Sequence, residues 1–145
     1  MIGRMIKNIL AAYDGSETAE SALEFAVELA KAFQASLHVL TVAGPLENSV
    51  SVELDASPER ARRHGEERQQ PARARLASLQ IPTHFHVAVG QAKDEIVRYA
   101  GSHAIDHILV GHRGHTFLER WVIGSVARHV IAQAPCAVTV VRKPA

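Results

Sequence analysis

The sequence is poor in cysteine and carries no excess of charge of either sign. With one cysteine, the chain cannot form an internal disulfide, and we expect Cys136 to be a small buried apolar residue in a reducing compartment. Sixteen Lys and Arg residues oppose fifteen Asp and Glu residues. The overall charge therefore gives no reason to expect a nucleic acid or a membrane surface as a partner.

Long apolar runs and two common phosphate-binding motifs are absent as well. No run approaches the roughly 20 apolar residues of a membrane span, and the amino terminus lacks the features of a signal peptide, so we expect a cytoplasmic protein. No G-x-x-x-x-G-K-[ST] motif occurs, and the first apolar run leads into Asp14-Gly15-Ser16 rather than G-x-G-x-x-G. These absences exclude a P-loop lysine and a dinucleotide fingerprint.

Five short apolar runs alternate with four helical patterns along the chain. We expect strands at residues 7–13, 37–42, 83–89, 108–110 and 137–142, and helices at about residues 17–33, 58–79, 93–103 and 125–133. This alternation predicts one domain over residues 1–145 with a three-layer α/β fold and a mostly parallel sheet. In such sheets ligands bind beyond the carboxyl ends of the strands.

Local signals mark where the helices begin and which side they bury. Ser16 and Ser57 are expected N-caps, because a serine hydroxyl can accept a hydrogen bond from the first helical turn. Pro71 should kink or divide the second helix, since proline removes an intrahelical bond. In the last helix we expect Val126, Val130 and Ile131 to point inward.

A glycine-rich stretch after the fourth strand is the main candidate for a site. Gly111, Gly114 and Gly124-Ser125 follow the strand at 108–110 and lead into the last helix. Backbone N–H groups at such a helix start can surround an anion. The alternatives are a loop without ligand, a glycine needed only for unusual dihedral angles, and a serine that only caps the helix. Asp14 should lie at the same sheet edge, to bind a ribose or base or to cap the first helix turn.

Two further clusters carry weaker signals. His84 and His86 alternate along one strand, and a solvated pair at a sheet edge is favoured over a metal site because no third ligand has a readable spacing. The helix at 58–79 is rich in arginine, yet local glutamates and the lack of interleaved aromatic residues favour a solvated face over a nucleic-acid surface.

The glycine spacing Gly111-x2-Gly114-x9-Gly124-Ser125 resembles the ATP-binding signature of the universal stress protein family. Asp14-Gly15-Ser16, Val89-Gly90 and Ala134-Pro135-Cys136 resemble other landmarks of that family. The resemblance implies a Rossmann-like sheet of order 3-2-1-4-5 and a homodimer paired through the last strand, Ala137 to Arg142. It also implies ATP, possibly with Mg²⁺, across the carboxyl ends of strands one and four.

The resemblance assigns a binding role to twelve residues. It places Asp14 and its neighbouring backbone at the adenine and ribose, Val42 and Val110 near the base, and the glycines and the helix start at the ribose and phosphates. His112 and Arg113 are loop residues that can meet phosphate charge. The full set is Ala12, Tyr13, Asp14, Val42, Val110, Gly111, His112, Arg113, Gly114, Gly124, Ser125 and Val126. The chain departs from the usual family pattern at Ala12 and Ala137, where many members have proline.

The residues around the glycines favour binding over catalysis. Fast phosphoryl transfer needs positioned cations on the γ-phosphate, and only Arg113 and Arg120 are candidates, with no carboxylate pair for a metal nearby. We therefore expect a dimeric, nucleotide-responsive stress regulator with at most slow hydrolysis. A slow ATPase and a nucleotide-free interaction module are the alternatives. The valine-rich last strand would be an exposed edge in a monomer, which is a physical reason for pairing.

Overall fold

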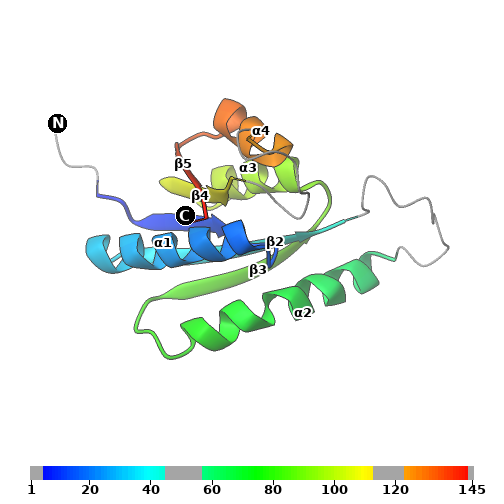
Figure 1. Cartoon of the computed structure of the whole chain (residues 1–145), viewed down its shortest axis with the longest axis horizontal. Helices are drawn as coiled ribbons and strands as arrows, with labels where there is room; N and C mark the ends of the chain where they lie inside the picture. The colour runs from blue at the N-terminus through cyan, green and yellow to red at the C-terminus, as the bar shows by residue number, and fades with distance from the viewer. Residues whose placement is uncertain (1–4, 45–56, 113–122, 144–145) are drawn as a thin grey trace.

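The computed structural model describes residues 5–44, 57–112 and 123–143. Its centre is a five-stranded parallel sheet of order β3-β2-β1-β4-β5, which confirms the predicted strand order (Figure 1). The strands are β1 (Asn8–Ala12), β2 (Ser36–Ala43), β3 (Thr83–Val89), β4 (His107–Gly111) and β5 (Ala137–Val141).

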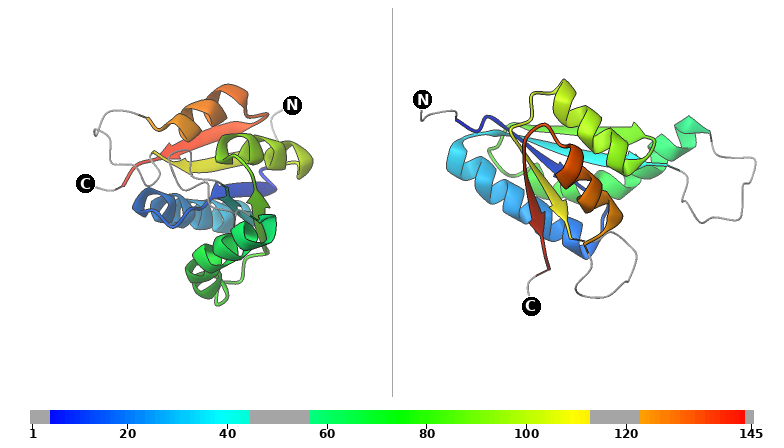
Figure 2. Two further views of the ribbon diagram at one scale, coloured as in Figure 1. Left: turned by 90° about the vertical axis from the view of Figure 1, so that its right-hand side faces the viewer. Right: turned by 90° about the horizontal axis from the view of Figure 1, so that it is seen from above.

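Four helices cover the two faces of this sheet. They are α1 (Glu17–Phe33), α2 (Pro58–Leu76), α3 (Ala92–Ser102) and α4 (Ser125–Gln133). Helices α1 and α2 lie on one side of the sheet, and α3 and α4 lie on the other (Figure 2). Each face has its own apolar core: Leu23 and Leu37 belong to the α1 side, and Ile96 and Val130 to the α3–α4 side. The predicted three-layer α/β fold is confirmed.

The expected capping serines close the helices on the α1 side. The Ser16 hydroxyl accepts from Ala19 N–H, and the Ser57 hydroxyl accepts from Arg60 N–H. Pro71 does not divide α2, which runs as one helix through it. Buried residues before and after the proline hold both halves on the sheet: the Gln69 amide donates to the Val39 and His86 carbonyl oxygens, at 3.2 and 3.1 Å. Tertiary contacts therefore offset the lost intrahelical bond.

Two predicted core positions are wrong or only partly right. Ile131 is 49% exposed, while Val130 is fully buried. Neighbouring helical residues point about 100° apart, and the buried stripe of α4 runs through Ala127 and Val130, so Ile131 lies off it. Cys136 is a free, half-buried thiol rather than a fully buried one. No helix within the described ranges is long and apolar enough to cross a membrane.

Candidate functional site

The carboxyl ends of β1 and β4 meet at one edge of the sheet. The two strands pair in parallel, with Ala11 opposite Leu109, so Asp14 and Gly111 come to the same edge, as predicted. The end of β4 lies tightly against α1: a Cβ on Gly111 would lie 2.5 Å from the Thr18 hydroxyl oxygen. Gly111 is therefore required for packing alone, whatever binds nearby.

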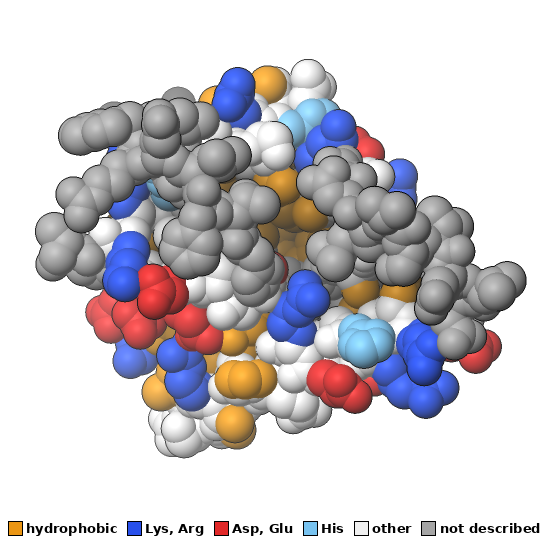
Figure 3. Space-filling model, turned by 45° about the vertical axis from the view of Figure 1, so that its right-hand side comes forward, with side chains coloured by type: hydrophobic (Ala, Val, Ile, Leu, Met, Phe, Trp, Pro, Cys, Tyr) orange, Lys and Arg blue, Asp and Glu red, His pale blue; other side chains and the backbone are white. Residues whose placement is uncertain are grey.

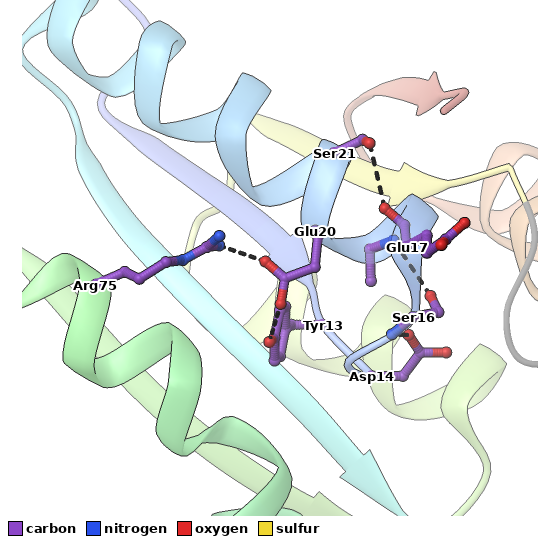
Figure 4. Close-up of polar contacts among 8 residues, drawn as sticks. Tyr13, Asp14, Ser16, Glu17, Glu20, Ser21 and Arg75 are labelled. Atoms are coloured by element: carbon purple, nitrogen blue, oxygen red, sulfur yellow. Dashed lines mark hydrogen bonds and ion pairs between the residues drawn. The ribbon is translucent and has the colours of Figure 1, made fainter. Parts of the chain in front are cut away.

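The junction between β1 and α1 makes its own polar contacts. An Asp14 carboxylate oxygen accepts from Ser16 N–H at 2.9 Å, and Gly15 takes the left-handed backbone, with φ of +82°, that glycine tolerates (Figure 4). The Ser16 hydroxyl then caps α1, and Glu17 and Glu20 add carboxylates to its first turn. Asp14 thus caps the turn before the helix, and its carboxylate is held at the sheet edge.

The junction between β4 and α4 is built differently. His112 N–H donates to the Val141 carbonyl at 2.7 Å, and Gly124 N–H donates to the His112 carbonyl at 2.9 Å. These two bonds hold the start of α4 directly beside the ends of β4 and β5. Gly124 is the N-cap, so no side chain caps α4, and no acidic residue lies in its first turn.

This geometry changes how Gly124 and Ser125 are interpreted. Gly124 has φ of −60° and ψ of 155°, an ordinary extended backbone, so unusual dihedral angles do not explain the glycine. Ser125 is the first residue of the helix, so the interpretation of Ser125 as a simple N-cap is wrong. A glycine at position 124 leaves room for another group to approach the helix start closely.

Three backbone donors lie at that helix start. The first intrahelical bond of α4 runs from Arg128 N–H to the Gly124 carbonyl. The N–H groups of Ser125, Val126 and Ala127 precede it, and they have no acceptor among the described residues. The Gly124 N–H is already donated to His112. The first N–H group at the helix start that is open to a ligand is therefore that of Ser125, one residue later than the sequence suggested.

An apolar floor lies next to these donors on the α3–α4 face. Val110 is buried there, and Ala12, Val42, Ile123 and Val126 are half-buried against the same core. Figure 3 shows hydrophobic side chains near the centre of this side of the molecule. Ile123 was not among the predicted site residues, because the spacing of the glycines carries no information about it.

The Tyr13 side chain lies on the opposite face. It is 2% exposed, its hydroxyl donates to Glu20, and Glu20 pairs with Arg75 of α2, so the three residues tie β1, α1 and α2 together (Figure 4). Burial, and then the Glu20 carboxylate, raise the pKa of Tyr13. Only the backbone of Tyr13 can contribute at the α3–α4 face. The Tyr13 side chain is therefore structural, and the predicted contribution of the backbone next to Asp14 stays a prediction.

The structure describes ten of the twelve predicted residues, and of these Tyr13 turns its side chain to the opposite face. Arg113 and Gly114 lie outside the described residues, as does Arg120. His112 is 5% exposed and is placed by its backbone bonds to Val141 and Gly124. Among the residues that the structure describes, no group of three His, Cys, Asp or Glu side chains is arranged to hold a metal ion.

Comparison with known proteins gives the family of this chain. The model of the universal stress protein family matches residues 5–142. The chain belongs to this family. It is 32% identical over 146 residues to the universal stress protein MJ0531 of Methanocaldococcus jannaschii, covering 97% of this chain and 84% of that one. The solved structure of UspA from Lactobacillus plantarum has a TM-score of 0.81 and 27% identity, covering 97% of this chain and all of the other.

Some solved universal stress proteins of the same fold hold adenine nucleotides. One is a complex with cAMP (TM-score 0.73, 20% identity, covering 97% of this chain and 100% of that one). Another, from Archaeoglobus fulgidus, is a complex with dAMP (TM-score 0.70, 23% identity, covering 95% and 99%). A third, from Arabidopsis thaliana, has AMP bound (TM-score 0.65, 16% identity, covering 96% and 93%). At these identities, the three structures show only that this chain has the same fold as they have.

Proposed function

We propose that this universal stress protein is one nucleotide-binding domain that binds ATP at the carboxyl edge of its sheet. In this proposal it acts in the cytoplasm as a dimeric, nucleotide-responsive regulator. The proposal rests on the start of α4. It is held at the end of β4 by the bond between Gly124 and His112, and it lacks both a capping side chain and an acidic first turn.

Such a helix start favours a phosphate group. Three backbone N–H groups and the positive end of the helix dipole face the same point. Each hydrogen bond from a neutral donor to a charged acceptor is worth about 1.5–3 kcal/mol. The absence of a side chain at Gly124 lets a phosphate approach the backbone, and the Ser125 hydroxyl is exposed next to it.

The other end of an adenine nucleotide matches the rest of the edge. Ala12, Val42 and Val110 offer apolar contacts for the base, and the Asp14 carboxylate can accept from ribose hydroxyl groups. The AMP, dAMP and cAMP of the related structures support an adenine nucleotide as the class of ligand. ATP in particular rests on the glycine signature, and Mg²⁺ would be carried by the phosphates.

We assign binding, with slow hydrolysis at most, to this site. The N–H groups of α4 hold substrate and transition state alike, which favours affinity over turnover. A slow ATPase is the second candidate and would require the cations of Arg113 or Arg120 on the γ-phosphate. For the dimer, β5 is an edge strand whose residues Val138 to Val141 are only half-buried, and pairing of two such edges would cover them.

One substitution separates phosphate binding from folding. Ser125→Asp places a carboxylate in the first turn of α4, where it stabilises the helix but repels a phosphate. We expect isothermal titration to show ATP affinity at least tenfold weaker, about 1.4 kcal/mol, with an unchanged or higher melting temperature. Gln133→Glu adds the same charge at the far end of α4 and is the matched control.

The outcomes of this titration distinguish the candidate functions. Loss of affinity in Ser125→Asp alone supports the site. Equal ATP affinity in Ser125→Asp and in the unchanged protein contradicts it. If the unchanged protein binds no adenine nucleotide and releases none on denaturation, the chain is a nucleotide-free interaction module instead.

A further inference from the structure

Five aromatic rings, four of them histidines, gather on the α3 side of the sheet. They come from β2, β3 and α3 and are called the histidine cluster here; they are His38, His84, His86, Tyr99 and His103. The ring centroids of His38 and His84 are 4.7 Å apart, and the Tyr99 ring stacks on His103 at 3.7 Å. His84 and His86 are exposed on the edge strand, as predicted, but they lie against this cluster rather than alone in solvent.

Hydrogen bonds fix the neutral form of the buried member. The Asn8 amide nitrogen donates to the Ala104 carbonyl at 3.3 Å, which turns its oxygen toward His38 Nε2, 3.4 Å away. His38 must then carry its proton on Nε2. Its Nδ1 accepts from the Tyr99 hydroxyl at 2.7 Å. A second proton on Nδ1 would remove the acceptor of this bond and force the hydroxyl to turn.

The surroundings of the cluster oppose added charge. His38 is 7% exposed, and burial, followed by the charges of His84 and His103, lowers its pKa to about 4. Burial, His103 and the nearby Arg62 of α2 lower the pKa of His86, against the opposite effect of Glu95. Glu95 of α3 is the carboxylate that acts on His86 in the opposite direction, and it pairs with Arg98.

The histidine cluster contributes to the attachment of the carboxyl end of α3. Tyr99 and His103 lie in its last turns, and residues 101–104 are exposed. Ala104, which follows the helix, has φ of +49°, a left-handed backbone that costs about 1–2 kcal/mol in a residue with a side chain. The buried residues of this turn are Tyr99, Ala100 and Ile105, and the Asn8 amide bonds the Ala104 carbonyl.

We propose that the histidine cluster is an acid-sensitive latch, which holds the carboxyl end of α3 on β2 and β3 and releases it as the pH falls. The release is local and leaves α1 and the sheet folded. It is independent of nucleotide binding.

The sign of the effect follows from the direction of the shifts. A histidine whose pKa is lower in the closed state than in the open state stabilises the closed state. This contribution is fully present when the pH is above the ordinary histidine pKa of 6.5. That stability is lost as the pH falls from about 6.5 toward about 4. Over this window each proton taken up on opening multiplies the open fraction by up to tenfold per pH unit.

Hydrogen exchange of the backbone amides tests the latch. Between pH 6.5 and 4.5 we expect the protection of α3, corrected for the intrinsic rate, to fall roughly 30- to 100-fold relative to α1. In His84→Asn, which removes the charge nearest His38 from an exposed position, the fall should be several-fold smaller. His64→Asn, on the exposed face of α2, is the matched control and should behave like the unchanged protein.

Several results would overturn the proposal. They are a parallel loss of protection in α1 and α3, an identical fall in His84→Asn, and a His38 imidazole that titrates near pH 6.5 by NMR. Should His84→Asn fail to fold, His103→Asn provides the same comparison, because it removes a charge 6.0 Å from His38 at an exposed position.

Discussion

The two junctions at the carboxyl edge of the sheet begin helices in opposite ways. At the β1–α1 junction, Ser16 caps the helix, Asp14 caps the preceding turn, and two glutamates occupy the first helical turn. At the β4–α4 junction, a glycine is the cap, the serine comes one residue later, and no carboxylate is present in the first turn. At the first junction, side chains of the chain itself cap the helix and place negative charge at the positive end of its dipole. At the second junction no such side chain is present, so that end can bind an anion.

The comparison shows that a serine next to a helix start can have two different roles. Ser16 precedes α1 and stabilises the folded chain, while Ser125 begins α4 and leaves its first backbone donors without a capping side chain. The difference is a shift of one residue relative to the helix. We therefore expect substitutions at the β1–α1 junction to change mainly the stability, and substitutions at the start of α4 to change mainly the affinity for the ligand.

The largest effect on stability is expected where the junctions touch. In Gly111→Ala the new Cβ would lie 2.5 Å from the Thr18 hydroxyl oxygen and 2.9 Å from its backbone carbonyl carbon. We expect urea unfolding to show a loss of about 1–3 kcal/mol with or without nucleotide. Gly101→Ala, in open space on α3, should instead stabilise by about 0.5–1 kcal/mol. Equal stabilities of these two variants would contradict the tight contact between β4 and α1.

A smaller effect separates the two serines. Ser16→Ala loses the cap of α1 and should destabilise the protein by about 1 kcal/mol in the same unfolding measurement. Ser125→Ala should change stability by less than about 0.5 kcal/mol, because its hydroxyl is exposed and caps nothing. Equal losses in both variants would mean that Ser125 caps α4 after all, and the contrast between the junctions would fail.

The sequence predicted the fold well because its signals are local. The bounds of α1, β3 and α4 agree with the structure, since a capping serine, a β-branched run and a stopping proline each act within a few residues. Pro71 was misjudged because contacts from Gln69 to two strands hold α2 across it. Ile131 was misjudged because helical spacing alone left the edge of the buried stripe open.

The site was predictable in place but not in detail. Parallel strands and glycine spacing brought Asp14 and Gly111 to one edge, as expected. The use of Gly124 N–H by His112 and the burial of the Tyr13 side chain on the opposite face depend on three-dimensional packing. The histidine cluster was also beyond reach, because the rotation of α3 decides which of its rings meet His38.

An NMR titration of the backbone amides with ATP tests directly whether the start of α4 binds phosphate. We expect the largest downfield shifts, which accompany bonding of N–H groups to phosphate, at Ser125, Val126 and Ala127. The amides of Ser16 and Ala19, already bonded to Asp14 and Ser16, should change little. Phosphate binding at α4 would be contradicted if saturating ATP left the amide resonances of Ser125, Val126 and Ala127 unchanged. Larger shifts at the start of α1 would contradict it as well.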